Sequence, residues 1–98
     1  MPNEVITKEM LRKAPTAHHA AILKKRLDDI CEMVMRIAKR GDETYFVYYI
    51  TEASLSAHRE MAPYDYFPSI EDLVTGLSKR FEEGMVKRIA EGILINWS

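Results

Sequence analysis

Histidine and cysteine side chains are the first candidates for chemistry in this chain. The usual zinc ligands, imidazole and thiol groups, come from His18, His19, Cys31 and His58. Their spacing argues against a shared site, because neighbouring helical residues point about 100° apart and Cys31 lies roughly three turns beyond His19. We therefore expect no metal ion, with the first two histidines solvated and Cys31 acting as a small apolar residue.

Acidic residues of the same predicted helix form a second group. Asp28 and Glu32 share a helix face, where two carboxylates could work as acid and base or hold a divalent cation. However, Lys25 stands four residues before Asp29 and Arg36 stands four after Glu32, which is the spacing of exposed helical ion pairs. The pattern favours a solvated charged face.

A third group of potential chemistry lies between the two aromatic segments of the chain. It comprises Ser54, Ser56, His58 and Glu60. No nucleophile turn or oxyanion-hole motif surrounds these residues in the sequence. The sequence therefore predicts a protein that is not an enzyme, with no catalytic residue and no cofactor.

Basic residues occur in four short runs, each with acids nearby. The runs are Lys24-Lys25-Arg26, Lys39-Arg40, Lys79-Arg80 and Lys87-Arg88. Cations of this kind hold phosphates while exposed tyrosines stack on bases, so a small nucleic-acid-binding protein is the alternative function. Its contacts would be Lys24, Lys25, Lys87 and Arg88. A formal net charge of −1 gives no overall attraction to nucleic acid.

The segment Tyr45–Ile50 is apolar on both faces when it is read as a strand. Successive strand side chains point to opposite faces, which places Tyr45, Val47 and Tyr49 on one side. Phe46, Tyr48 and Ile50 then lie on the other side. Neither set is typical of a solvated face, so we expect a partner chain or a returning terminal segment to cover the second one.

Tyrosine is among the side chains that contribute most to protein–protein contacts. Five tyrosines gather in this strand and in a nearby loop that holds two prolines. The sequence therefore predicts an interface formed by Tyr45, Tyr48, Tyr49, Tyr64, Tyr66 and Phe67.

Capping residues and helical periodicity locate the N-terminal elements. Thr7 can cap a short helix that ends near Ala14, because Pro15 disfavours helix in the residue before it. Thr16 then caps a long helix that closes at Gly41. The apolar stripe of this long helix consists of Ala20, Leu23, Leu27, Ile30, Val34 and Ile37.

The second half of the chain predicts two more helices and a hairpin. A short helix over 51–61 is optional, and Ser69 caps a second helix that Gly84 closes. Residues 85–97 alternate as a hairpin that turns at Glu91-Gly92. Three residues of its last strand should face the helices: Ile93, Ile95 and Trp97.

The expected fold class is α+β: a small antiparallel sheet of about three strands against a long N-terminal helix and a second helix. The order is helix, helix, strand, optional helix, helix, strand, strand. With 98 residues, 47% of them apolar, we expect one domain over 1–98, with residues 1–15 as an N-terminal arm or short helix. A single cysteine and the lack of a signal-peptide or membrane-spanning pattern favour a cytoplasmic protein without a membrane partner.

The layout from Leu27 to Trp97 resembles that of small α+β proteins from tailed phages and large DNA viruses. The resemblance consists of a helix, the aromatic strand, the helix opened by Ser69-Ile70-Glu71-Asp72-Leu73, and a closing Ile93-Leu94-Ile95-Asn96-Trp97. Such proteins are mostly accessory or virion-associated factors, and some bind other proteins. The resemblance implies an accessory role in the host cytoplasm or the virion, and it assigns no functional residue.

We therefore predict a non-enzymatic interaction module that uses the aromatic strand and the loop around Tyr64–Phe67. It would form a homo-oligomer, with a dimer as the expected state, or dock on a larger phage or viral assembly.

Overall fold

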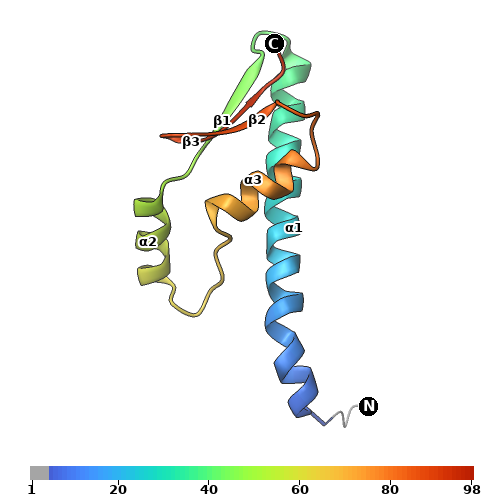
Figure 1. The fold of residues 1–98 in the computed structure, drawn as a ribbon, viewed down its shortest axis with the longest axis vertical. Coiled ribbons are helices and arrows are strands. Elements are labelled where there is room, and N and C mark those ends of the chain that lie inside the picture. Colours follow the sequence, from blue (N-terminus) through green and yellow to red (C-terminus); the bar gives the residue numbers. More distant parts are fainter. Residues whose placement is uncertain (1–4) are drawn as a thin grey trace.

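Three helices and one three-stranded sheet make up residues 5–98, the part of the chain that the computed structural model describes (Figure 1). The elements in chain order are α1 (Lys8–Arg40), β1 (Tyr45–Tyr49), α2 (Glu52–Met61), α3 (Ile70–Ser78), β2 (Val86–Ile89) and β3 (Gly92–Asn96). The predicted α+β class and the order of elements are confirmed.

α1 begins where the sequence predicts, because the Thr7 side chain accepts a hydrogen bond from the Met10 N–H at 3.1 Å. The predicted break near Ala14 and the second cap at Thr16 are wrong, since one helix runs through Pro15. A proline inside a helix deprives the carbonyl four residues earlier of its partner. Both Leu11 and Pro15 are exposed, so water can reach that carbonyl.

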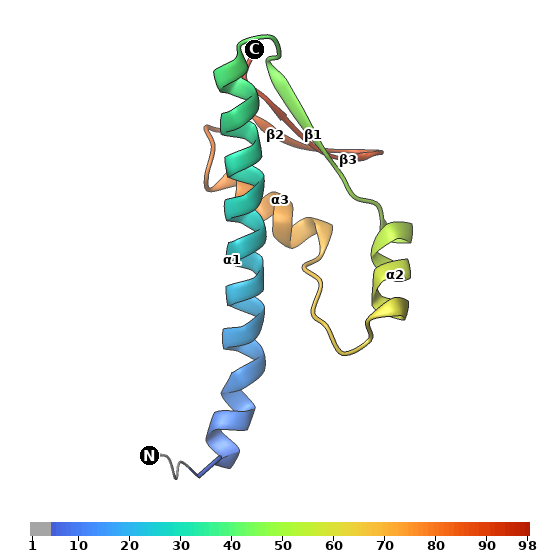
Figure 2. The ribbon, with the colours of Figure 1, turned by 180° about the vertical axis from the view of Figure 1, so that it is seen from behind.

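The other end of α1 matches the prediction. Gly41 has a φ of 80° and donates its N–H to the Ala38 carbonyl at 3.2 Å, which gives a left-handed cap. The helix packs on the core mainly through Leu27, Ile30 and Val34, the buried residues of its C-terminal half. The first turns of the helix project beyond the other elements, as Figure 2 shows from behind.

The sheet has the order β1-β3-β2, and both strand pairs are antiparallel. α1 and α3 pack on one face, and the core lies between them and the central strand β3. Ile93 and Ile95 of β3 are fully buried and Trp97 is partly buried against the core, which confirms that this side of the strand faces the helices.

The hairpin prediction is confirmed with a shift of one residue in the turn. Ile89 pairs with Gly92, so the loop consists of Ala90 and Glu91. Gly92 also allows β1 to approach, because a Cβ atom there would lie 2.0 Å from the Tyr48 carbonyl oxygen. A larger residue cannot occupy this position without moving β1.

Both shorter helices are capped by side chains; the cap at Ser69 is as predicted, whereas not all of the predicted bounds are. Thr51 and Ser54 form a capping box on α2, and the Ser69 side chain accepts the Asp72 N–H at 3.1 Å at the start of α3. α3 ends at Ser78 rather than at Gly84. The N–H groups of Lys79 and Arg80 bond the carbonyls three residues earlier, and this tighter turn ends the helix.

Candidate interaction surface

The strand register assigns each side chain to one face of the sheet, because residues paired across antiparallel strands share a face. Tyr48 pairs with Ile93, which is buried under the helices. Val47 pairs with Leu94 on the opposite side, and Leu94 pairs with Lys87. We call this opposite side the open face; it consists of Tyr45, Val47, Tyr49, Lys87, Ile89, Leu94 and Asn96.

No segment among residues 5–98 covers the open face. The apolar side chains of the open face do not pack on the hydrophobic core. Tyr45 and Tyr49 are 49% and 77% exposed. The expectation that β1 is apolar on both faces is thus confirmed. Within the described chain, however, no terminal segment returns to cover the second face, since β3 is the last element and pairs inside the sheet.

Tyr48 lies on the helix face of the sheet. Its hydroxyl accepts a hydrogen bond from Nη1 of Arg26 at 3.0 Å, and its ring packs against the core. The side chain therefore already has partners inside the molecule. Its predicted part in an interface stays a prediction, but it does not share a face with Tyr45 and Tyr49.

The loop aromatics also divide into internal and exposed groups. Tyr66 stacks on His19 with ring centroids 3.8 Å apart, and Phe67 stacks on His58 at 5.8 Å. Tyr64 is fully exposed. Of the six predicted interface residues, Tyr45 and Tyr49 lie together on the open face, while Tyr64 stands apart on the loop.

Burial raises the pKa of Tyr66, and the nearby Asp72 carboxylate adds to the effect. Both causes disfavour the phenolate, which carries a negative charge. The opposing influence of Arg59 is smaller. The ring of Tyr66 therefore holds the loop against α1 in its neutral form.

The histidines act as stacking partners, a role that no sequence pattern indicated. His19 of α1 meets Tyr66 of the distant loop, and His58 of α2 meets Phe67. Within residues 5–98 no three histidine, cysteine or acidic side chains lie close enough together to hold a metal ion.

The acidic residues of α1 form ion pairs. Lys25 reaches Asp29 at 3.4 Å and Arg36 reaches Glu32 at 2.6 Å, which confirms the exposed pairs that their spacing predicts. Asp28 accepts from Lys24 at 2.9 Å and from Arg80, beyond the end of α3, at 2.8 Å. Lys24, and then Arg80, lower the pKa of the Asp28 carboxyl.

The four basic residues of the nucleic-acid alternative do not gather in one patch. Lys24 and Lys25 are engaged with acids on α1. Lys87 lies on the open face, whereas Arg88 points to the other face and reaches Glu52 at 3.5 Å. The arrangement provides no continuous positive track.

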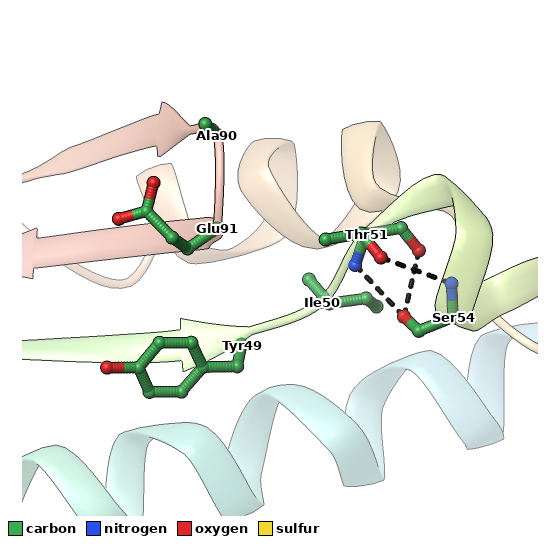
Figure 3. Close-up of a pocket in the computed structure, with 6 residues that line it drawn as sticks. All are labelled: Tyr49, Ile50, Thr51, Ser54, Ala90 and Glu91. Atoms are coloured by element: carbon green, nitrogen blue, oxygen red, sulfur yellow. Dashed lines mark hydrogen bonds between the residues drawn. The ribbon is translucent and has the colours of Figure 1, made fainter.

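A hollow of about 430 Å³ lies at one end of the open face, where β1 leads into α2 (Figure 3). Tyr49, Ile50 and Ala90 give it apolar walls and Glu91 stands at its rim. Ser54 also lines it, but its hydroxyl donates to the Thr51 carbonyl and accepts the Thr51 N–H. The serine is thus occupied by the helix cap, and the hollow extends the apolar open face.

Comparison of the chain with protein-family models, with curated proteins and with solved structures found no match. No helix within residues 5–98 has the length and apolar character needed to cross a membrane.

Proposed function

We propose that this chain is a non-enzymatic protein–protein interaction module that associates with a second copy of itself through β1. The observation that supports this function is the open face. Tyr45, Val47 and Tyr49 of β1 lie in line there beside Ile89 and Leu94, and no described segment covers them. The two tyrosines are exposed and the three aliphatic side chains beside them are half-buried, and an apolar patch of this kind supports an interaction site.

The residue types on the open face fit a contact surface better than a catalytic or ligand-binding site. Tyrosine supplies a large apolar ring with a polar hydroxyl and has few rotatable bonds to order on binding. The single basic residue, Lys87, and Asn96 flank the apolar residues. A polar rim around an apolar centre is the usual anatomy of a protein interface.

Docking on a larger assembly, including a phage or viral one, is the second form of the same proposal. Two surfaces would remain for it after self-association. Tyr64 is fully exposed on its loop, and Ile6 before α1 and Met10 and Leu11 in its first turns are exposed as well.

Light scattering of the purified chain across a dilution series tests this function, with the 260 to 280 nm absorbance ratio recorded in the same run. We expect a dimer free of nucleic acid that dissociates on dilution. A Tyr49→Glu variant should weaken the dimer about 30-fold or more, because it replaces an aromatic side chain of the contact with a charged one.

Tyr64→Glu is the matched control, since it makes the same change at an exposed tyrosine away from the sheet. We expect it to dimerise like the parent chain. A parent chain that stays monomeric at all concentrations would contradict self-association, and a monomer that carries nucleic acid would support the alternative through Lys24, Lys25, Lys87 and Arg88.

A further inference from the structure

The backbone of β1 carries hydrogen-bonding groups that the molecule itself does not use. The Ile50 N–H bonds the Glu91 carbonyl at 3.1 Å, and the Trp97 N–H bonds the Thr44 carbonyl at 2.9 Å. In an antiparallel pair, hydrogen-bonded residues alternate with residues whose N–H and C=O point away. The register therefore directs the backbone groups of Phe46 and Tyr48 towards β3, and those of Tyr45, Val47 and Tyr49 outward.

No described strand pairs with this outer edge, because β1 is a terminal strand of the sheet. The same three residues also present their side chains on the open face. Tyr45, Val47 and Tyr49 thus combine unpaired backbone groups at the edge of the sheet with side chains on its open face.

The two edges of the sheet differ in their protection against pairing. Proteins commonly prevent edge strands from pairing by placing lysine, other charges or proline on them. β2 follows this rule with Lys87 and Arg88 among its four residues. β1 has the sequence Tyr-Phe-Val-Tyr-Tyr, which lacks charge and proline and consists of residues that favour strands.

We propose that β1 pairs antiparallel with β1 of a second copy, edge to edge, about a two-fold axis at Val47. This inference rests on the proposed self-association and specifies its geometry. The result is one continuous six-stranded sheet in the order β2-β3-β1-β1-β3-β2.

The register centred on Val47 satisfies the largest number of free groups. Val47 lies opposite the partner's Val47, and Tyr45 lies opposite the partner's Tyr49. The two-fold axis adds the equivalent pair, Tyr49 opposite the partner's Tyr45. Each of these pairs exchanges two backbone hydrogen bonds. Shifting the axis to Phe46 or Tyr48 leaves fewer outward residues of β1 opposite each other. The contact is self-complementary, as a two-fold dimer requires.

Side chains support the same register. Tyr45 and the partner's Tyr49 become neighbours on one face across the new strand pair, and such aromatic pairs stabilise sheets. α1 packs against β1, so the pairing also brings the two α1 helices towards each other.

Stacking two open faces on each other is the competing geometry, and the size of the face disfavours it. Three strands about 4.8 Å apart, of four or five residues rising about 3.3 Å each, have a footprint of roughly 220 Å². A stable dimer buries about 800 Å² of accessible surface on each partner. Edge pairing does not depend on this area, because backbone hydrogen bonds contribute much of its specificity.

Spin labels at position 87 distinguish the two geometries. Lys87, Leu94 and Val47 lie in one row across the sheet, and the pairing extends that row into the second copy. A Lys87→Cys variant, made with Cys31→Ser to remove the native thiol, should place the two labelled backbones about 24 Å apart, five strand spacings. Stacked faces would bring them to about 10–14 Å, because stacked sheets pack about 10 Å apart and the two β2 strands would be offset by at most two strand spacings.

Proline substitutions test the edge itself. Val47→Pro removes an outward N–H and should convert the dimer to a monomer. Arg88→Pro is the matched control: the Asn96 N–H bonds the Met85 carbonyl, so the Arg88 N–H points outward from the other edge. Both variants should stay folded, because edge strands tolerate proline where the N–H faces solvent.

A labelled dimer with the two positions about 10–14 Å apart would overturn the edge pairing and leave self-association standing. A Val47→Pro variant that remains a folded dimer by circular dichroism and light scattering would overturn the edge pairing in the same way. If Val47→Pro does not fold, the label distance in the Lys87→Cys variant, whose β1 is unchanged, distinguishes the two geometries. A monomeric parent chain would instead contradict both the pairing and the proposed function.

Discussion

The hydroxyl of Tyr48 accepts a hydrogen bond from Nη1 of Arg26 at 3.0 Å, which ties the aromatic strand to the middle of α1. This bond separates Tyr48 from its neighbour Tyr49, whose ring lies on the open face and is 77% exposed. Adjacent tyrosines of β1 therefore have different roles: Tyr48 belongs to the fold, and Tyr49 is available for a partner.

Tyr48→Phe should lower the stability of the fold without affecting self-association. The ring stays in place while one hydrogen bond is lost, which costs about 1 kcal/mol and lowers the melting temperature by about 4–8 °C. Thermal unfolding followed by circular dichroism measures the loss, and light scattering measures the association. A folded Tyr48→Phe variant that dissociates at concentrations where the parent chain is a dimer would show that Tyr48 itself takes part in the contact.

Gly92→Ala should be strongly destabilising. The new Cβ atom would lie 2.0 Å from the Tyr48 carbonyl oxygen and 2.7 Å from the Ile50 nitrogen, so β1 and β3 must separate. We expect a loss of about 3 kcal/mol or more, measured as a shift of the urea unfolding midpoint. Gly84→Ala is the control, because no atom lies within 4 Å of its Cβ position and only its positive φ of 89° is strained. Equal losses in the two variants would contradict the close approach at Gly92.

Tyr66 should make the stability of the protein depend on pH in the alkaline range. Its pKa is raised above the ordinary value of 10.0, so the folded state holds the proton more tightly than the unfolded state. The stabilisation is complete below the unfolded pKa and is lost as pH rises through the folded one. The free energy of unfolding should therefore fall above about pH 10.

The contribution of Tyr66 is isolated by comparing the parent chain with Tyr66→Phe, because other tyrosines and the lysines titrate in the same range. The difference in unfolding free energy between the two should change with pH above about pH 10, and less so in an Asp72→Asn background. A difference that stays constant from about pH 8 to about pH 11 would contradict the partly buried position of this phenol beside Asp72.

Pro15→Ala should stabilise the projecting first turns of α1 locally. It restores one backbone hydrogen bond and removes a residue that costs about 3 kcal/mol relative to alanine inside a helix. Hydrogen exchange of the amides near residue 15 should slow, while the global unfolding midpoint changes little because the surrounding side chains lie in solvent. A gain of similar size in global stability would instead indicate that this part of the helix unfolds together with the core.

Caps could be predicted because each depends on a few neighbouring residues. Thr7 and Ser69 lie three residues before the N–H groups that they accept from, and Gly41 lies three after the carbonyl that it bonds. The helix ends predicted near Pro15 and at Gly84 are wrong, because they do not depend on neighbouring residues alone. At those positions the outcome depends on access of water to a carbonyl and on a tight final turn at Ser78, which neighbouring residues alone do not specify.

Alternation along β1 likewise follows from local geometry, so the division of its side chains between two faces could be predicted from sequence. Which face meets the helices could not, because both are apolar. The stacking of His19 on Tyr66 and of His58 on Phe67 left no signal at all, since histidine and aromatic residues have no spacing that predicts such a contact.

The α+β class, the caps and the two-sided apolar strand can be derived from the amino-acid sequence, because they depend on periodicity and on neighbours within one turn. Three further properties emerge from the folded chain: Tyr48 faces α1, Tyr45 and Tyr49 lie on the open face, and β1 is an edge strand. Those properties follow from the register between strands far apart in the chain. Pairing of Val47 with Leu94, across nearly half the sequence, sets that register.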